Sequence, residues 1–282
     1  MDYWVPVIFE PPEQYLELAR VAEACGYEGL ALADHVAVPA EFSSVHPSGE
    51  NPFTDASAFP DPFVTMSAMA AVTTTLRFMS YVYVLPMRDP FTVAKQVGTT
   101  AVLSGGRVVL GVGAGWLTEE IAILGPDPRT RGRRMDEMID VLRDFWDDGY
   151  AEHHGEFFDF PRVGMFPKPD QQVPIWVGGT SDAALRRAVR TGGWLGMNYG
   201  LDEIQQRLAR LAELRAEAGD TRADFEVFVI ANALPEPDLY RTLEGWGVTS
   251  TMVMPWYPGD PAFASIDAKR AALERTAEAL AL

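Results

Sequence analysis

Short apolar runs alternate with amphipathic stretches along the chain, and this alternation is its clearest structural pattern. The runs are rich in β-branched and aromatic residues, which favours strands. Most of them are nearly continuous, as in parallel strands that are buried on both faces. The eight expected strands cover 3–9, 28–33, 76–84, 107–113, 173–179, 193–199, 225–232 and 249–255.

Between these runs, apolar residues recur every three or four positions, which predicts helices that lay one face on a sheet. The clearest examples are 12–25, 131–148 and 202–218. Eight strands with intervening helices can form a closed barrel or an open doubly wound sheet. The count of eight favours a (β/α)8 barrel, which typically takes about 250 residues. We therefore expect the 282 residues to form one domain, 1–282, with insertions in the βα loops.

The largest expected insertion is the segment 34–60, which is rich in Pro, Ser and Asp and is of the kind that covers active sites. The competing open sheet depends on GVGAGW (111–116), which resembles a dinucleotide-binding loop. In that motif the glycines follow G-x-G-x-x-G after the first strand. Here the third glycine comes one residue early and the motif follows the fourth strand, so the pattern disfavours this alternative.

Composition narrows the classes of partner. A formal charge of −17 argues against nucleic acid and anionic membranes. The first residues, MDYWVPVIFEPPEQ, lack the basic and apolar regions of a signal peptide. No apolar run approaches the roughly 20 residues that span a bilayer. We therefore expect a cytoplasmic protein that acts on a small-molecule substrate. The one cysteine, Cys25, cannot form an internal disulfide and is expected to be a small buried apolar residue.

Catalytic residues of a (β/α)8 barrel lie at the C-terminal ends of its strands, which excludes several chemistries. The histidines are His35, His46, His153 and His154, and no two have metal-ligand spacing, so no metal site is expected. The adjacent His153 and His154 are expected in an exposed loop. No lysine lies at a strand end for a Schiff base, and no pair of carboxylates lies where a glycosidase needs one.

The strand ends instead carry small and polar residues. Asp34 and His35 follow the second strand, and Gly113–Trp116 follow the fourth. The fifth ends in Gly178-Gly179-Thr180-Ser181, directly before the helical pattern DAALRRAV. Bare N–H groups at a helix start are a common anion site. The alternative is a tight βα turn in which Thr180 or Ser181 caps the helix.

Three ordered motifs resemble the luciferase-like monooxygenase superfamily and, within it, the actinobacterial F420-dependent oxidoreductases. They are LPMRDPFTVAKQVGTTAVLSGGRVVLGVGAGW (85–116), RGRRMDEMIDVLRDFW (131–146) and VPIWVGGTSDAALRRA (173–188). The resemblance runs from about residue 2 to the last strand. It implies the barrel fold, a homodimer and a flavin-type cofactor, F420 or alternatively FMN.

The resemblance also implies site residues. Asp34 and His35 would stand at the redox face of the cofactor as its catalytic residues. The bond between Tyr81 and Val82 would be cis, bulging against the back of the ring. The remaining cofactor contacts would be Ala114, Gly115, Gly178, Gly179, Thr180 and Ser181. Arg131, Arg133 and Arg134 match the family's RGRR segment, although such residues are also typical of a salt-bridged helix start.

One residue departs from the pattern. The F420-dependent sugar-phosphate dehydrogenases carry a glutamate where this chain has Trp116, which makes a sugar phosphate an unfavourable substrate. Phe42, Trp116, Trp256 and Tyr257 would instead line an apolar mouth suited to a hydrophobic ketone, enone or aldehyde, although ordinary packing explains such residues equally well.

Three functions follow from these observations. The first is hydride transfer between F420 and a small apolar substrate. The second is an FMN-dependent monooxygenase that receives reduced flavin from a separate reductase. The third is a protein that binds the cofactor without turnover.

Overall fold

Eight parallel strands close into a barrel in the computed structural model, which describes residues 1–282. The (β/α)8 fold expected from the sequence is therefore confirmed. The barrel strands, in spatial order, are β1 (Asp2–Pro6), β2 (Gly29–Leu32), β3 (Arg77–Ser80), β5 (Val108–Gly113), β8 (Ile175–Gly178), β9 (Gly193–Tyr199), β10 (Glu226–Ala231) and β11 (Ser250–Met252). Pairing of β11 with β1, and of β3 with β5, closes the ring.

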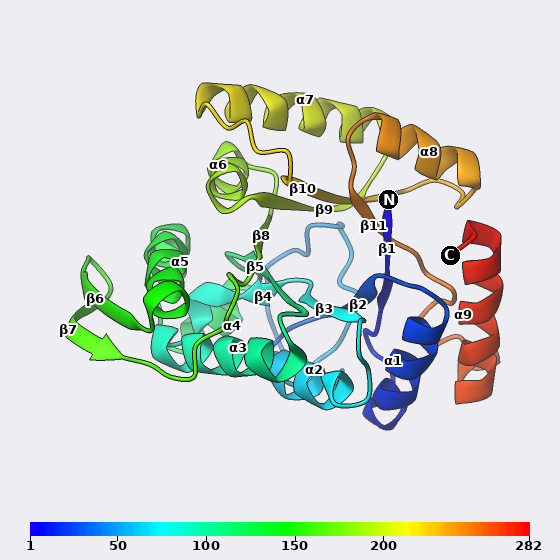
Figure 1. Ribbon diagram of the computed structural model, residues 1–282, viewed down its shortest axis with the longest axis horizontal. Helices are drawn as coiled ribbons and strands as arrows, with labels where there is room; N and C mark the ends of the chain where they lie inside the picture. The colour runs from blue at the N-terminus through cyan, green and yellow to red at the C-terminus, as the bar shows by residue number, and fades with distance from the viewer.

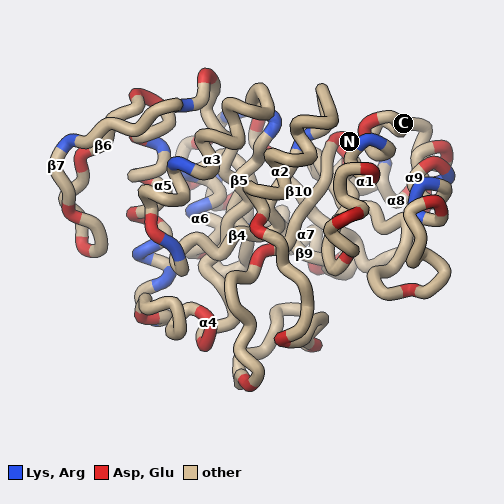
Figure 2. Tube along the Cα trace, turned by 90° about the horizontal axis from the view of Figure 1, so that it is seen from below, with Lys and Arg blue, Asp and Glu red and all other residues tan.

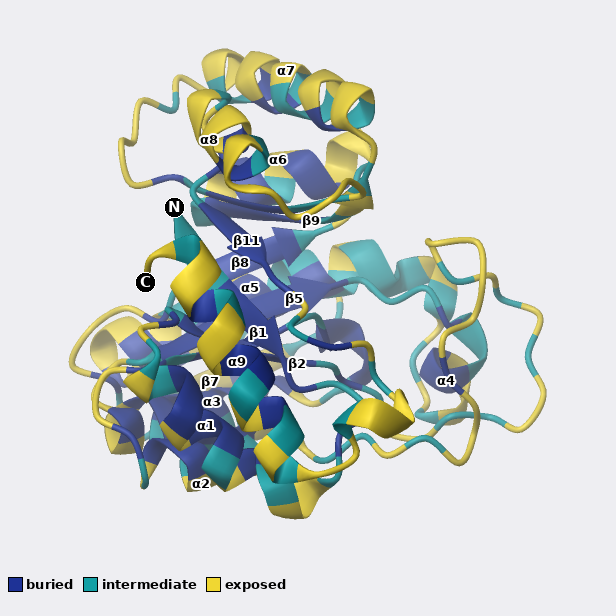
Figure 3. Ribbon diagram, turned by 90° about the vertical axis from the view of Figure 1, so that its right-hand side faces the viewer, coloured by how far each residue is buried: buried dark blue, intermediate teal, exposed yellow.

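Side chains fill the interior of the barrel. Each of the eight strands contributes one residue to an inner cluster: Trp4, Ala31, Met79, Val109, Trp176, Leu195, Phe228 and Met252. A larger cluster of 55 buried residues lies between the strands and the surrounding helices. In Figure 3 the strands are accordingly dark blue, whereas the outer faces of the helices are yellow. The packed interior leaves the strand ends as the place for a ligand.

Helices surround the barrel (Figure 1). They are α1 (Tyr15–Ala24), α2 (Pro62–Ala70), α3 (Pro90–Ser104), α4 (Thr118–Ile123), α5 (Arg131–Asp148), α6 (Asp182–Thr191), α7 (Leu201–Glu217), α8 (Pro237–Gly245) and α9 (Ile266–Leu280). The short 3-10 helices are η1 (Pro12–Gln14), η2 (Leu85–Met87), η3 (Pro128–Thr130) and η4 (Pro261–Phe263). Local sequence explains where α2 and α3 begin, because Asp61 and Asp89 cap main-chain N–H groups and a proline follows each.

The structure divides the third expected strand, 76–84, into β3 and the two-residue β4 (Tyr83–Val84). The division falls at the peptide bond between Tyr81 and Val82, which is cis, as the resemblance implied. A second difference concerns His153 and His154, which were expected in a loop. They lie in β6 (Tyr150–His154), which pairs with β7 (Asp159–Gly164) in an antiparallel hairpin that projects beyond α5.

Acidic and basic residues are interspersed over the outer elements of the molecule (Figure 2). On α9, for example, Arg270 pairs with Glu17 of α1, which lies beside it. None of the helices combines the length and the apolar composition that crossing a bilayer requires. A long segment without helix or strand connects β2 to α2, and it contains the insertion 34–60.

Candidate active site

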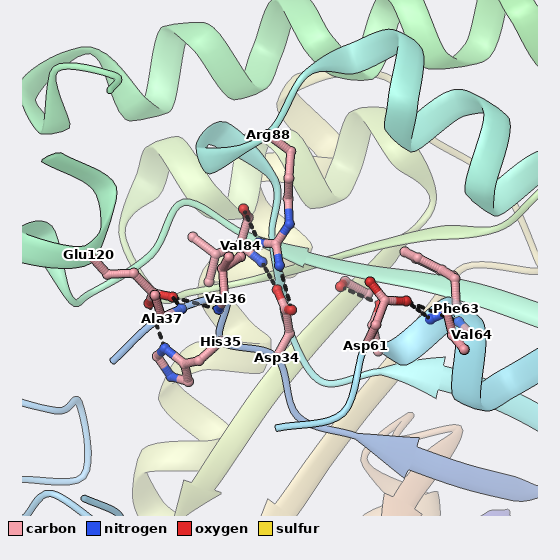
Figure 4. A network of polar contacts seen from close by, with 12 residues as sticks. Asp34, His35, Val36, Ala37, Asp61, Phe63, Val64, Val84, Arg88 and Glu120 are labelled. Atoms are coloured by element: carbon pink, nitrogen blue, oxygen red, sulfur yellow. Dashed lines mark hydrogen bonds and ion pairs between the residues drawn. The ribbon is translucent and has the colours of Figure 1, made fainter. Parts of the chain in front are cut away.

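His35 lies just beyond β2, where a buried carboxylate fixes its imidazole. Its Nδ1 is 2.6 Å from Oε2 of Glu120, in α4. The other oxygen of Glu120 accepts the main-chain N–H groups of Val36, at 2.6 Å, and Ala37, at 3.0 Å (Figure 4). Sequence reasoning did not identify Glu120, because 85 positions separate it from His35.

The contacts of Glu120 determine which nitrogen of His35 carries a proton. Burial by itself would raise the pKa of Glu120, but the hydrogen bonds from His35, Ala37 and Val36 hold it below its usual value. An ionised carboxylate only accepts hydrogen bonds, so the neutral imidazole carries its proton on Nδ1. Its Nε2 makes no hydrogen bond and is not fully buried, so it is free to act on a ligand.

Asp34 is held by two hydrogen-bond donors. Its Oδ2 accepts the N–H of Val84 at 3.0 Å, and its Oδ1 lies 2.6 Å from Nη2 of Arg88. Burial raises the pKa of Asp34, whereas Arg88 and the Val84 N–H oppose that change. Both oxygens are occupied and the residue is only 4% exposed, so these contacts give Asp34 an anchoring role, and its catalytic role stays a prediction. The carboxylate anchors the segment that follows Val82, and Arg88 is the partner that sequence reasoning missed.

The neighbour of Glu120 holds the long insertion. Glu119 accepts hydrogen bonds from the main chain and hydroxyl of Ser43, at 2.7 and 2.9 Å. It also accepts the N–H of Ser44 at 3.1 Å and its hydroxyl at 2.6 Å. These donors hold the pKa of Glu119 at about 2. Consecutive residues of α4 therefore bind both the start of the 34–60 segment and its middle.

Aromatic rings enclose His35. The ring centroids of Phe53 and Phe59 lie 4.6 and 4.8 Å from that of the imidazole, and Trp116 lies at 6.1 Å. Phe42 contacts Trp116 at 5.9 Å, so the structure brings these two predicted pocket residues together beside His35. Phe53 and Phe59 were not singled out in the sequence, because nothing local distinguishes them from core phenylalanines.

The other two predicted pocket residues lie elsewhere. Trp256 is 5% exposed, and its indole N–H donates to Oε1 of Glu10 at 2.6 Å. Glu10 also forms an ion pair with the buried Lys269. Trp256 is therefore part of the buried framework, which corrects its assignment to an apolar mouth. Tyr257 is 74% exposed and contacts no other aromatic ring.

Val82 forms a surface at the end of the barrel. A Cβ atom on Gly113 would lie 2.8 Å from its Cγ2, and one on Gly178 would lie 3.2 Å from its Cγ1. The two glycines therefore leave room for Val82 above the ends of β5 and β8. The preceding residue, Tyr81, donates its hydroxyl to the Gly196 carbonyl at 2.7 Å. Tyr81 and Val82 stay half-buried between buried neighbours, so part of this bend is accessible.

The segment Gly178–Ser181 leads directly into α6. Ser181 caps this helix by accepting the N–H of Ala184 at 3.3 Å, so the capping alternative holds for Ser181. Gly179 has φ +116°, a conformation that favours glycine. Thr180 borders a surface recess whose other side is formed by Arg207 and Arg210 of α7. Ala114 and Gly115 follow β5 and are half-buried.

The remaining candidates are structural. Arg131 and Arg134 donate to the carbonyls of Pro128 and Pro86, at 2.7 and 3.1 Å, and Arg133 pairs with Glu156. Cys25 is half-buried and packs against the core, where burial raises the pKa of its thiol. No group of three His, Cys, Asp or Glu side chains is arranged to hold a metal ion.

Comparison with known proteins identifies a family and several relatives. The family model described as luciferase-like monooxygenase matches residues 5–238. An uncharacterised protein of Mycobacterium tuberculosis is 43% identical over 242 residues, which are 85% of this chain and 84% of that protein. The F420-dependent glucose-6-phosphate dehydrogenase of Microbacterium testaceum is 26% identical over 83% of this chain and 67% of its own length.

The match to a flavin-dependent relative covers a smaller part of both chains. The oxygenase component of the trigonelline monooxygenase of Acinetobacter baylyi is 29% identical over 64% of this chain and 46% of its own length. Among solved structures, the monooxygenase RslO1 of Streptomyces bottropensis has a TM-score of 0.79 at 18% identity, covering 100% of this chain and 99% of its own. The F420-dependent tetrahydromethanopterin reductase of Methanopyrus kandleri has a TM-score of 0.76 at 14% identity, covering 99% and 98%. These two likenesses show the fold.

Proposed function

The chain belongs to the luciferase-like monooxygenase family, and we propose that within it the protein is an F420-dependent oxidoreductase acting on a small, uncharged, apolar substrate. The observation that carries this proposal is the pairing of His35 with Glu120 at 2.6 Å inside an aromatic enclosure. Bound F420 supplies or accepts a hydride. Hydride transfer to a carbonyl also needs a proton for the oxygen, and the reverse reaction needs a base.

His35 is the group placed to handle that proton. In the oxidising direction, Nε2 accepts the proton of the substrate hydroxyl. The proton on Nδ1 stays there and remains hydrogen-bonded to Glu120. In the reducing direction the imidazolium returns a proton from Nε2 to the substrate oxygen. The ionised Glu120 stabilises the imidazolium and holds the ring in one orientation, as an acidic partner does in other catalytic histidine pairs.

The residues at the barrel end fit a flat ring with a phosphate-bearing chain. Val82, held over Gly113 and Gly178, would support the face of the ring. The main chain of Gly179–Ser181 at the start of α6 would receive the phosphate, because N–H groups and the helix dipole both favour an anion there. Asp34 would keep the support in place through Val84 and Arg88.

The recess beyond Thr180 favours F420 over FMN. FMN ends at its phosphate, whereas F420 continues from a phosphodiester into a tail that bears carboxylates. Arg207 and Arg210 border the recess. Arg207 pairs with Glu203 at 2.6 Å, and Arg210 pairs with Asp182 at 2.5 Å and with Glu213 at 2.6 Å. These pairs are solvent-exposed, so carboxylates of a ligand would compete for the arginines at a small energetic cost.

Charge and shape favour an apolar substrate. Arg88 is already paired with Asp34, the buried residue that precedes His35. Trp116 stands where a carboxylate would serve a sugar-phosphate dehydrogenase. A ketone, aldehyde or secondary alcohol with an apolar body suits an enclosure formed by Phe42, Phe53 and Trp116.

The alternative within the family is an FMN-dependent monooxygenase, and the oxygenase component of the trigonelline monooxygenase of Acinetobacter baylyi is a flavin-dependent relative. Titration of the purified protein with F420 and with FMN at one salt concentration separates the two. We expect F420 to bind more tightly and Arg207→Gln to weaken only F420 binding, whereas Arg270→Gln on α9 leaves both affinities unchanged. Micromolar binding of FMN without detectable binding of F420 would overturn the proposal. F420 binding without substrate-dependent oxidation or reduction would instead indicate a binding protein.

A further inference from the structure

Phe9, in the loop that follows β1, has an unusual backbone. Its φ is +60°, and only Ala281 shares a positive φ among the residues that are not glycine. A bulky residue in this region is a steric outlier, and such a residue persists only where its surroundings enforce the conformation. Residues of this kind gather at ligand and active sites.

A buried ionic cluster enforces the conformation. The next residue, Glu10, is 4% exposed and binds the indole N–H of Trp256 at 2.6 Å as well as the ammonium group of Lys269. The same ammonium group donates to Oε1 of Gln14 at 2.5 Å. The chain directly after Phe9 is therefore tied to η1, to α9 and to the segment after β11. The cluster of Glu10, Lys269 and Gln14 takes no part in the proton transfer proposed for His35.

The ring of Phe9 is thereby directed at the enclosure of His35. It lies 5.5 Å from Phe59 in an edge contact and 6.2 Å from Phe53. Phe53 and Phe59 contact each other at 5.1 Å, and each also contacts the imidazole. Both belong to the 34–60 insertion, whereas Phe9 belongs to the loop between β1 and η1.

We propose that Phe9 is a positioning residue for His35: its ring, held by the strained backbone and the Glu10 cluster, keeps Phe53 and Phe59 against the imidazole. The hydrogen bond to Glu120 holds only one edge of the imidazole, and a change in the side-chain torsions of His35 would break this bond and turn Nε2 away from a substrate. The phenylalanine rings packed on the imidazole oppose this change. The catalytic part of the proposal rests on the proposed function, whereas the orientation of the imidazole does not.

Three variants separate the ring from the strain. Phe9→Gly removes the ring and suits a positive φ, and Phe9→Leu keeps apolar bulk without an aromatic face. Ala281→Gly is the matched control, because it relieves a positive φ at the C-terminal end of the chain. The first readout is ¹⁵N NMR of His35 in the protein without cofactor, at a pH where the imidazole is neutral. The second is kcat and KM of the F420-loaded enzyme.

We expect Phe9→Gly to stay folded, to lose the single Nδ1–H signature of His35, and to lower kcat roughly 10–10²-fold with a smaller change in KM, as misplacement of a reacting group does. The kcat of Phe9→Leu should lie between those of Phe9→Gly and the wild type. Ala281→Gly should match the wild type in kcat and in the ¹⁵N signature of His35. An unchanged ¹⁵N signature in Phe9→Gly, or in Phe9→Leu should the glycine variant unfold, would overturn the proposal. If no variant and no wild-type protein turns over with F420, the proposed function fails while the NMR result still decides the role of Phe9.

Discussion

Glu120 orients His35 by accepting its Nδ1–H at 2.6 Å while the same carboxylate binds the two main-chain N–H groups that follow His35. The imidazole and the turn after it are therefore held by one side chain. In Glu120→Gln the amide can still accept from the main chain, but its NH2 group would face Nδ1 and favour the opposite tautomer.

We expect Glu120→Gln to lower turnover by about 10–10²-fold, since general acid–base catalysis is worth about 10²–10⁴-fold and the imidazole itself is retained. Steady-state kinetics with F420 provides the measurement. Glu23→Gln is a suitable control, because Glu23 binds the main chain of Thr74–Leu76 near the start of β3, away from the strand ends that carry His35. Full activity of Glu120→Gln would show that His35 works without a fixed tautomer.

His35→Ala should reduce turnover by roughly 10²–10⁴-fold, because it removes the proton donor and acceptor itself. Cofactor affinity should change much less, since the residues proposed to hold the cofactor lie at the ends of β5 and β8, in the turn before α6, on α7 and at the β3–β4 bend. Parallel measurement of kcat and of the F420 dissociation constant makes the comparison. Loss of binding in proportion to rate, or loss of folding, would assign His35 to packing under the 34–60 insertion.

Gly178→Ala should weaken F420 binding about tenfold or more while the barrel stays folded. The added Cβ would lie 3.2 Å from Cγ1 of Val82 and displace the supporting surface. Valine at this position would displace Val82 further, so we expect the barrel to stay folded in the alanine variant only. Gly200→Ala is the control, because a Cβ there meets no atom within 4 Å. Equal F420 affinity in both variants would place the cofactor elsewhere.

Acid should release the 34–60 insertion before it unfolds the barrel. The pKa of Glu119 is about 2 in the folded protein and near 4.5 when unpaired, so its contribution is complete above the higher value and is lost as pH falls toward the lower one. The protection of the main-chain N–H groups around Ser43 and Ser44 against hydrogen exchange, relative to the intrinsic rate at each pH, should therefore fall across this window. Glu119→Gln should exchange faster at neutral pH and lack this transition. Identical exchange profiles in the two proteins would remove Glu119 as the holding group.

The sequence predicted the barrel because its signal is local and repeated: each strand is a short apolar run and each helix has its own spacing. The break at Tyr81–Val82 was predicted by resemblance alone, since the residues 76–84 read as one strand. The hairpin containing His153 and His154 was missed because exposed strands have no continuous apolar pattern.

The site was harder to predict because its contacts join distant positions. Asp34 and His35 are adjacent and look like a catalytic pair in the sequence. In the fold, the aspartate contacts Arg88 and the histidine contacts Glu120. Trp256 was expected to line a pocket, but its indole N–H donates a hydrogen bond to Glu10, which is 246 positions away in the sequence. Composition and spacing carry no information on such pairs, which depend on the three-dimensional arrangement of the loops.

One short helix, α4, binds both the insertion and the imidazole, and this arrangement links access to chemistry. Because Glu119 and Glu120 are consecutive residues, a displacement of the insertion is expected to reach the turn after His35 through α4. The position of the insertion over the site and the orientation of the imidazole would therefore depend on each other.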